Sequence, residues 1–167
     1  MKVLLMSDTH NYIDDKILTY VNQADEVWHA GDIGNLAVAD AIQEKKPLRG
    51  VYGNIDGTDV RKEFPLEQYF EIDGYRVYMI HIGGYPKRYA KGIKEKLQMK
   101  KPHLFISGHS HILKVINDHD LGLLHFNPGA IGKQGFHQKR TMLRFEIKNT
   151  QINNLEVIDL GKRGKLS

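Results

Sequence analysis

The sequence contains no cysteine among its 167 residues, and it has no long apolar run. Without cysteine, disulfides and thiolate metal sites are excluded. No segment approaches the roughly 20 apolar residues that a transmembrane helix needs, and the apolar run at 3–6 is too short for a secretion signal. We therefore expect a cytoplasmic protein with no membrane partner.

Charge of one sign is only slightly in excess, with 24 Lys and Arg against 20 Asp and Glu and a net charge of +4. Such an excess can indicate a nucleic-acid partner. However, two lysine pairs, at positions 45–46 and 100–101, lie at the ends of predicted helices, where cations offset the helix dipole. Lys162, Arg163 and Lys165 belong to a tail that we expect to be frayed. A solvated surface is the favoured interpretation, and nucleic acid is a disfavoured but open partner.

The length and the 41% hydrophobic content suit one well-formed core, so we expect a single domain over residues 1–167. Short apolar runs at 3–6, 26–30 and 48–52 predict strands. They alternate with two segments in which apolar residues recur at helical spacing, one at 13–21 and one after Asn35, the expected N-cap. This alternation predicts parallel strands in an α/β arrangement.

Further along the chain, hairpins and mixed elements replace this alternation. We expect a hairpin at 69–80 around Asp73-Gly74, a helix near 90–97, strands at 103–107, 113–116 and 121–126, a turn at 127–129, and a closing hairpin at 140–158. The predicted fold class is α/β, with two mixed β-sheets packed face to face and helices on the outside.

Seven side chains of metal-binding type follow the ends of predicted strands: Asp8, His10, Asp32, Asn54, His81, His109 and His111. In α/β sheets, bound ligands collect beyond the carboxyl ends of the strands, and five of these residues, Asp8, Asp32, Asn54, His81 and His109, occupy such equivalent positions. In the pairs spaced by two, an extended backbone would point both side chains to one side. The glycines before Asp32, Asn54 and His109 would permit close approach or unusual dihedral angles. Mixed oxygen and nitrogen ligands suit first-row divalent metals, and we expect a pair of ions.

The ordered motifs D-x-H, G-D, G-N, H and G-H-x-H resemble those of the calcineurin-like metallophosphoesterase superfamily. The short chain and the early start at Asp8 are similar to its small phosphodiesterase branch, which includes the retromer subunit of the vacuolar sorting machinery. The resemblance runs from Met1 to about Gly129. It implies a four-layer α/β/β/α sandwich.

The resemblance also implies a ligand set: Asp8, His10, Asp32 and His111 around one metal, and Asp32, Asn54, His81 and His109 around the other. Asp32 would bridge, since both carboxylate oxygens are acceptors. A hydroxide shared by ions about 3.5–4 Å apart would attack phosphorus, so that Asp32, Asn54 and His81 are catalytic through the metals and no side chain is the nucleophile. Mn²⁺ is the first choice, and Fe, Zn, Co or Ni would suit the same ligands.

One departure concerns proton transfer. The larger phosphatases of the superfamily usually read G-N-H-[DE], where the histidine is thought to assist the leaving group, but here Ile55 follows Asn54. Isoleucine cannot transfer a proton, and general acid catalysis commonly contributes about 10²–10⁴-fold. His137 and Arg140 could reach substrate, yet the group that protonates the leaving group stays open.

These observations favour a metal-dependent phosphoesterase of small phosphoesters, with phosphodiesters as the first choice. One alternative is a catalytically weak protein-binding scaffold of the same fold, which Ile55 and the retromer resemblance favour. Another is a nuclease, which needs a basic groove leading to the metals. The substrate and a homo-oligomeric state stay open.

Overall fold

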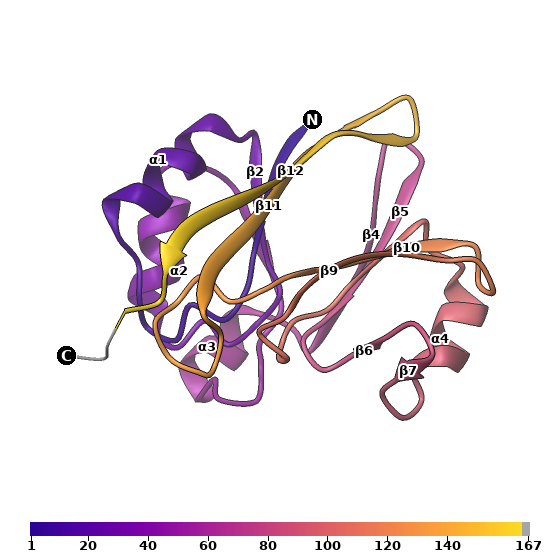
Figure 1. Ribbon diagram of the computed structural model, residues 1–167, viewed down its shortest axis with the longest axis horizontal. Coiled ribbons are helices and arrows are strands. Elements are labelled where there is room, and N and C mark those ends of the chain that lie inside the picture. The colour runs from indigo at the N-terminus through magenta and orange to yellow at the C-terminus, as the bar shows by residue number, and fades with distance from the viewer. Residues whose placement is uncertain (165–167) are drawn as a thin grey trace.

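The computed structural model describes residues 1–164 of the chain, and two five-stranded sheets form its centre (Figure 1). The first sheet has the order β12 (Gln151–Lys162), β11 (Lys139–Lys148), β1 (Lys2–Met6), β2 (Glu26–His29) and β3 (Leu48–Gly50). The second has the order β4 (Glu67–Ile72), β5 (Tyr75–Ile80), β8 (Leu104–Ile106), β10 (Leu123–Pro128) and β9 (Leu113–Asp118). The remaining elements are α1 (Asp15–Gln23), α2 (Leu36–Gln43), α3 (Thr58–Glu63), α4 (Ile93–Lys100) and a small hairpin, β6 (Gly84–Tyr85) with β7 (Arg88–Tyr89).

Both sheets are mixed, as predicted. In the first, β1, β2 and β3 run parallel, while β11 and β12 pair antiparallel beside them. In the second, β5, β8 and β10 run parallel, and the edge strands β4 and β9 are antiparallel. The carboxyl ends of the parallel strands therefore carry the loops in which the predicted ligands lie.

Side chains of β1 pack alternately on the two faces of the first sheet and so connect three layers of the fold. Val3 and Leu5 pack between the sheets, against residues such as Met79 of the second sheet, whereas Leu4 and Met6 pack against the helices on the other face. Burying each such aliphatic side chain contributes about 1.5–3 kcal/mol. The helices α1, α2 and α3 cover the first sheet, and α4 covers the second with Ile93 and Leu97. The predicted four-layer sandwich is confirmed.

Side-chain caps fix where the first two helices begin. Asp14 accepts a hydrogen bond from the Ile17 amide at 2.9 Å, and Asn35 accepts one from the Val38 amide at 3.2 Å. These contacts satisfy amide groups that have no partner within a helix. Asn35 is thus the cap that the sequence predicted. Within residues 1–164, no helix is long and apolar enough to cross a membrane.

The prediction of a frayed tail is wrong for Lys162 and Arg163. Strand β12 continues to Lys162, and the Arg163 guanidinium donates to the carbonyls of His137 at 3.0 Å and Lys133 at 3.1 Å. The planar fork of arginine allows both bonds at once, so it ties the strand end to the neighbouring loop. Lys165 lies outside the described residues.

Candidate metal centre

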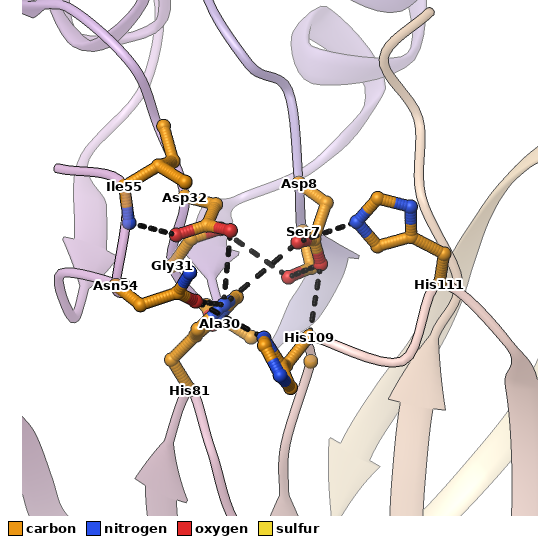
Figure 2. Close-up of polar contacts among 12 residues, drawn as sticks. Ser7, Asp8, Ala30, Gly31, Asp32, Asn54, Ile55, His81, His109 and His111 are labelled. Carbon is orange, nitrogen blue, oxygen red and sulfur yellow. Dashed lines mark hydrogen bonds and ion pairs between the residues drawn. The ribbon is translucent and has the colours of Figure 1, made fainter. Parts of the chain in front are cut away.

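All seven predicted ligands come together where the loops after β1, β2, β3, β5 and β8 meet, and six of them are labelled in Figure 2. Their donor atoms form two groups, Asp8 with His10 and His111, and Asp32 with His81 and His109. Within each group the donor atoms all lie within 4.8 Å of one another. Five loops from two sheets thus converge on one small volume.

The first group surrounds a buried carboxylate oxygen. Asp8 Oδ1 lies 3.1 Å from His111 Nε2 and 3.6 Å from His10 Nε2. Yet among the described residues neither Asp8 Oδ1 nor His10 Nε2 has a partner in hydrogen-bonding geometry, although both atoms are buried. A buried polar atom left in this way costs about 1–3 kcal/mol. A divalent cation fits here because it would coordinate both atoms.

In the second group, Asn54 supplies an amide oxygen in addition to the three ionisable side chains. His81 Nε2 lies 3.2 Å from Asp32 Oδ2 and 3.1 Å from Asn54 Oδ1, while His109 Nδ1 lies 3.0 Å from the same amide oxygen. Asp32 Oδ2 is also 3.4 Å from His10 Nε2 of the first group. Asp32 therefore stands between the two groups, the place that a bridging carboxylate needs.

Contacts behind the donor atoms orient them. His81 Nδ1 donates to the Ala30 carbonyl at 2.7 Å, which leaves Nε2 facing Asp32. Asp8 Oδ2 accepts from the Ser7 hydroxyl at 2.6 Å and the His109 amide at 3.2 Å, so Oδ1 is turned to the other histidines. His29 lies outside the set of candidate ligands. It is buried between Thr9 and Gly31, to which its ring nitrogens bond.

Asp56 is the residue whose importance the motif analysis did not assign. Its carboxylate accepts hydrogen bonds from the amides of Ile33 at 3.1 Å, Gly34 at 2.7 Å and Gly53 at 2.8 Å. These amides flank Asp32 and Asn54, so the carboxylate joins the loops after β2 and β3. The sequence did offer one indication of this role. Asp56 is an acidic residue two positions after Asn54, in a glycine-rich turn whose backbone amides need hydrogen-bond acceptors.

The backbone at the site differs from the expected extended form. Five of the predicted ligands have positive φ: Asp8 (56°), His10 (44°), Asp32 (56°), His109 (71°) and His111 (61°). Left-handed conformations disfavour side chains with a Cβ, and such strain persists only where surrounding contacts enforce it. The predicted role of the glycines holds at Gly53 and Gly108, because a Cβ there would overlap Asp32 and Ser7 respectively.

Charge pairing shifts the pKa values within the centre. Asp32 and then Asp8 raise the pKa of His10 to about 9. Burial opposes ionisation of both carboxyls, but His10 with His111 lowers the pKa of Asp8, and His10 with His81 lowers that of Asp32. The carboxylates are therefore ionised at neutral pH, the form that binds cations. A cation at His10 would replace a proton there.

The residues considered for proton transfer lie in different surroundings. Ile55 lies at the edge of the cluster, and its amide donates to Asp32 Oδ1 at 3.0 Å (Figure 2). The ring of His137 contacts that of His111 with centroids 5.2 Å apart, and its Nε2 donates to the Gly132 carbonyl at 2.8 Å. Arg140 is buried and bonds to Ile131 and Asp14, which gives it a structural role.

Known proteins are similar in sequence to most of this chain. A family model described as the calcineurin-like phosphoesterase superfamily domain matches residues 1–150. A protein of Methanothermobacter thermautotrophicus described as a probable metallophosphoesterase is 27% identical over 135 residues, covering 78% of this chain and 77% of the relative.

Two solved structures extend the comparison. Wild-type Vps29 of Entamoeba histolytica complexed with zinc has a TM-score of 0.72 at 16% identity, covering 95% of this chain and 99% of that one. A structure described as a novel archaeal phosphodiesterase has a TM-score of 0.68 at 20% identity, covering 96% and 100%. At these identities the two structures establish likeness of fold.

Proposed function

Because the chain belongs to the calcineurin-like phosphoesterase superfamily, we propose that it is a metal-dependent phosphodiesterase that uses two divalent ions. Family membership supports hydrolysis of phosphoesters with divalent metals. The number of ions and the ligand roles go further and rest on the site. The archaeal phosphodiesterase of the same fold makes diesters the first substrates to test.

The observation that carries this function is the position of Asp32 between two donor groups. Its Oδ2 lies 3.4 Å from His10 and 3.2 Å from His81, which belong to different groups. In our proposal Asp8, His10, Asp32 and His111 hold one ion, and Asp32, Asn54, His81 and His109 hold the other. Two such ions, when bound, activate water and neutralise charge on the phosphoryl oxygens.

The chain itself would orient and charge the site. Asp8 and Asp32 supply two negative charges, and Ala30 orients the His81 ring. Asp56 fixes the loops that carry Asp32 and Asn54. No side chain is proposed as the nucleophile. Mn²⁺ is the first ion to test, and the oxygen and nitrogen donors suit Fe, Zn, Co or Ni as well.

A protein-binding scaffold with weak activity is the second candidate. Ile55 favours it, since isoleucine cannot assist a leaving group, and so does the likeness of fold to Vps29. The seven assembled donors favour the enzyme. The two candidates differ in turnover, because only the enzyme is expected to hydrolyse phosphoesters at a rate that depends on both ions.

The deciding experiment is a screen of phosphomonoesters and phosphodiesters after reconstitution with each candidate metal. We expect hydrolysis of aryl diesters, a dependence on metal and two ions per chain. His111→Gln should abolish the activity, while the exposed residue His119 offers a matched control, His119→Gln, that should retain it. Failure of every ester with every metal would contradict the enzymatic function and leave the scaffold.

A further inference from the structure

Three exposed isoleucines each follow a candidate ligand directly. Ile55 follows Asn54, Ile82 follows His81 and Ile112 follows His111, with exposed fractions of 45%, 45% and 56%. One exposed isoleucine on a protein surface is ordinary. Here, however, three exposed isoleucines are chain neighbours of ligands from both donor groups.

Phe136 adds a fourth apolar side chain on the side of the first group. It is fully exposed, and its neighbours in the chain lie against His111. A Cβ at Gly135 would overlap the His111 ring, and the His137 ring contacts the same histidine. The loop that carries Phe136 is therefore held beside His111, next to the position of Ile112.

A separate contact joins the loop of Ile82 to the strand that follows Ile112. The Lys114 ammonium lies 3.2 Å from the centre of the Tyr85 ring, which connects β9 with β6. Arg61 is a cation near Ile55, with its Nε donating to the Asp56 carbonyl at 2.6 Å. One cation thus lies near Ile55, and another joins the segments that carry Ile82 and Ile112.

We propose that Ile55, Ile82, Ile112 and Phe136 form an apolar rim that binds the organic groups of the substrate. The substrate class is a phosphodiester whose non-leaving ester group is apolar, either alkyl or aryl. This inference rests on the proposed function and specifies its substrate. Each isoleucine is the chain neighbour of a candidate ligand, and the loop of Phe136 lies against His111, so we expect an ester group on a phosphate bound at the donor atoms to reach the rim.

The test keeps the leaving group constant and lengthens the other ester. Methyl, ethyl, propyl and butyl 4-nitrophenyl phosphates all release 4-nitrophenolate, and kcat/KM is measured on the manganese-reconstituted protein. We expect kcat/KM to rise about threefold to fourfold for each methylene that the rim buries. Equal values across the four esters would overturn the proposed rim.

Variants then assign the rise to the rim. Ile82→Ser and Phe136→Ser should each reduce the dependence on chain length. Val157→Ser on β12 is the matched control, because Val157 is a similarly exposed apolar residue, and it should leave that dependence unchanged. An equal reduction in the control would contradict a specific rim.

Affinity separates this inference from the proposed function. The protein is titrated calorimetrically with the methyl, ethyl, propyl and butyl esters of methylphosphonic acid, which carry no good leaving group. If affinity rises with chain length while no ester is hydrolysed, the rim holds and the enzymatic function fails. If esters are hydrolysed at rates independent of chain length and affinity is also flat, the rim fails and the phosphodiesterase stands.

Discussion

Asp32 is the residue whose charge the two donor groups share. Asp32→Asn keeps the shape and the oxygen that accepts from Ile55, but removes the charge that would hold two cations together. We expect fewer than two ions per chain. We also expect activity to fall by more than the roughly 10–100-fold that is lost when a hydrogen-bonding partner of a metal ligand is replaced. Metal analysis and turnover measure both. Asp40→Asn, at an exposed position of α2, is the control, and two ions with near-normal turnover in Asp32→Asn would contradict the bridge.

Ile55 determines how the rate depends on the leaving group. Without a proton donor at this position, rates should fall steeply as leaving-group pKa rises from nitrophenyl to alkyl esters. Ile55→His should restore part of the roughly 10²–10⁴-fold of general acid catalysis for alkyl esters, provided the ring reaches the leaving oxygen. Ile55→Leu is the control that changes shape alone.

A rate of hydrolysis that does not change with leaving-group pKa would contradict this expectation. It would mean that another group already donates the proton, and His137 would be the first to replace. Asp56 is not free to orient a histidine at position 55, because three backbone amides occupy its carboxylate.

The sequence was sufficient to identify the candidate ligands but not their backbone. Strand ends and motif order indicated seven candidates, which the structure brings together. Five of them lie just past an apolar run, and His10 and His111 come two residues after another candidate. The left-handed φ of Asp8 and His10 was not predictable, because it depends on the meeting of loops far apart in sequence. His10 and Asn11, for instance, donate their amides to the carbonyls of Asp32 and Ile33.

At the scale of elements, Asp56 joins the loop after β2 to the loop after β3. Hydrogen bonds to a charged group contribute about 1.5–3 kcal/mol each, and an asparagine retains only one acceptor oxygen. We expect Asp56→Asn to lower the free energy of unfolding by about 2–4 kcal/mol. Urea unfolding measures this change. Asp59→Asn, exposed on α3, should leave stability nearly unchanged, and equal losses in both variants would refute the joining role.

Element prediction succeeded where apolar spacing was regular. The hairpin at 69–80 is β4 and β5, and Asn35 begins α2 as a cap. The short helix α3 was missed, because six residues with one buried side chain give too little periodicity. The predicted turn at 127–129 was wrong for its first two residues, since β10 continues to Pro128 by pairing with Leu113.

For the whole molecule, the alternation of strands and helices, the later hairpins and the family resemblance predicted the layers. The structure confirms them, since β1 residues face alternately the second sheet and the helices. The resemblance to the calcineurin-like superfamily is confirmed by the family match over residues 1–150. A single domain over the full length stays a prediction, as do the cytoplasmic location and the assignment of each ligand.

Two buried histidines in different layers should make the stability of the whole molecule depend on pH. His29 lies behind the metal centre, and His125 lies against Phe105 in the second sheet. Burial lowers the pKa of each to about 4, from an ordinary value of 6.5. Below pH 6.5 the unfolded chain therefore binds more protons than the folded protein. The stability that these two groups contribute is fully present above pH 6.5 and falls as the pH decreases toward 4, by up to about 1.4 kcal/mol per pH unit for each group.

His10 acts in the opposite direction but in another range. Its pKa of about 9 gives stability that is present below pH 6.5 and is lost between pH 6.5 and 9, so it adds no slope below that range. Urea unfolding between pH 6.5 and 5, with a chelator to remove metal-linked protonation, measures the slope. His125→Gln should reduce it by up to about 1.4 kcal/mol per pH unit, because glutamine cannot be protonated in this range. His119→Gln, at an exposed turn, is the control. An unchanged slope in His125→Gln would show that the buried ring accepts its proton without loss of the fold.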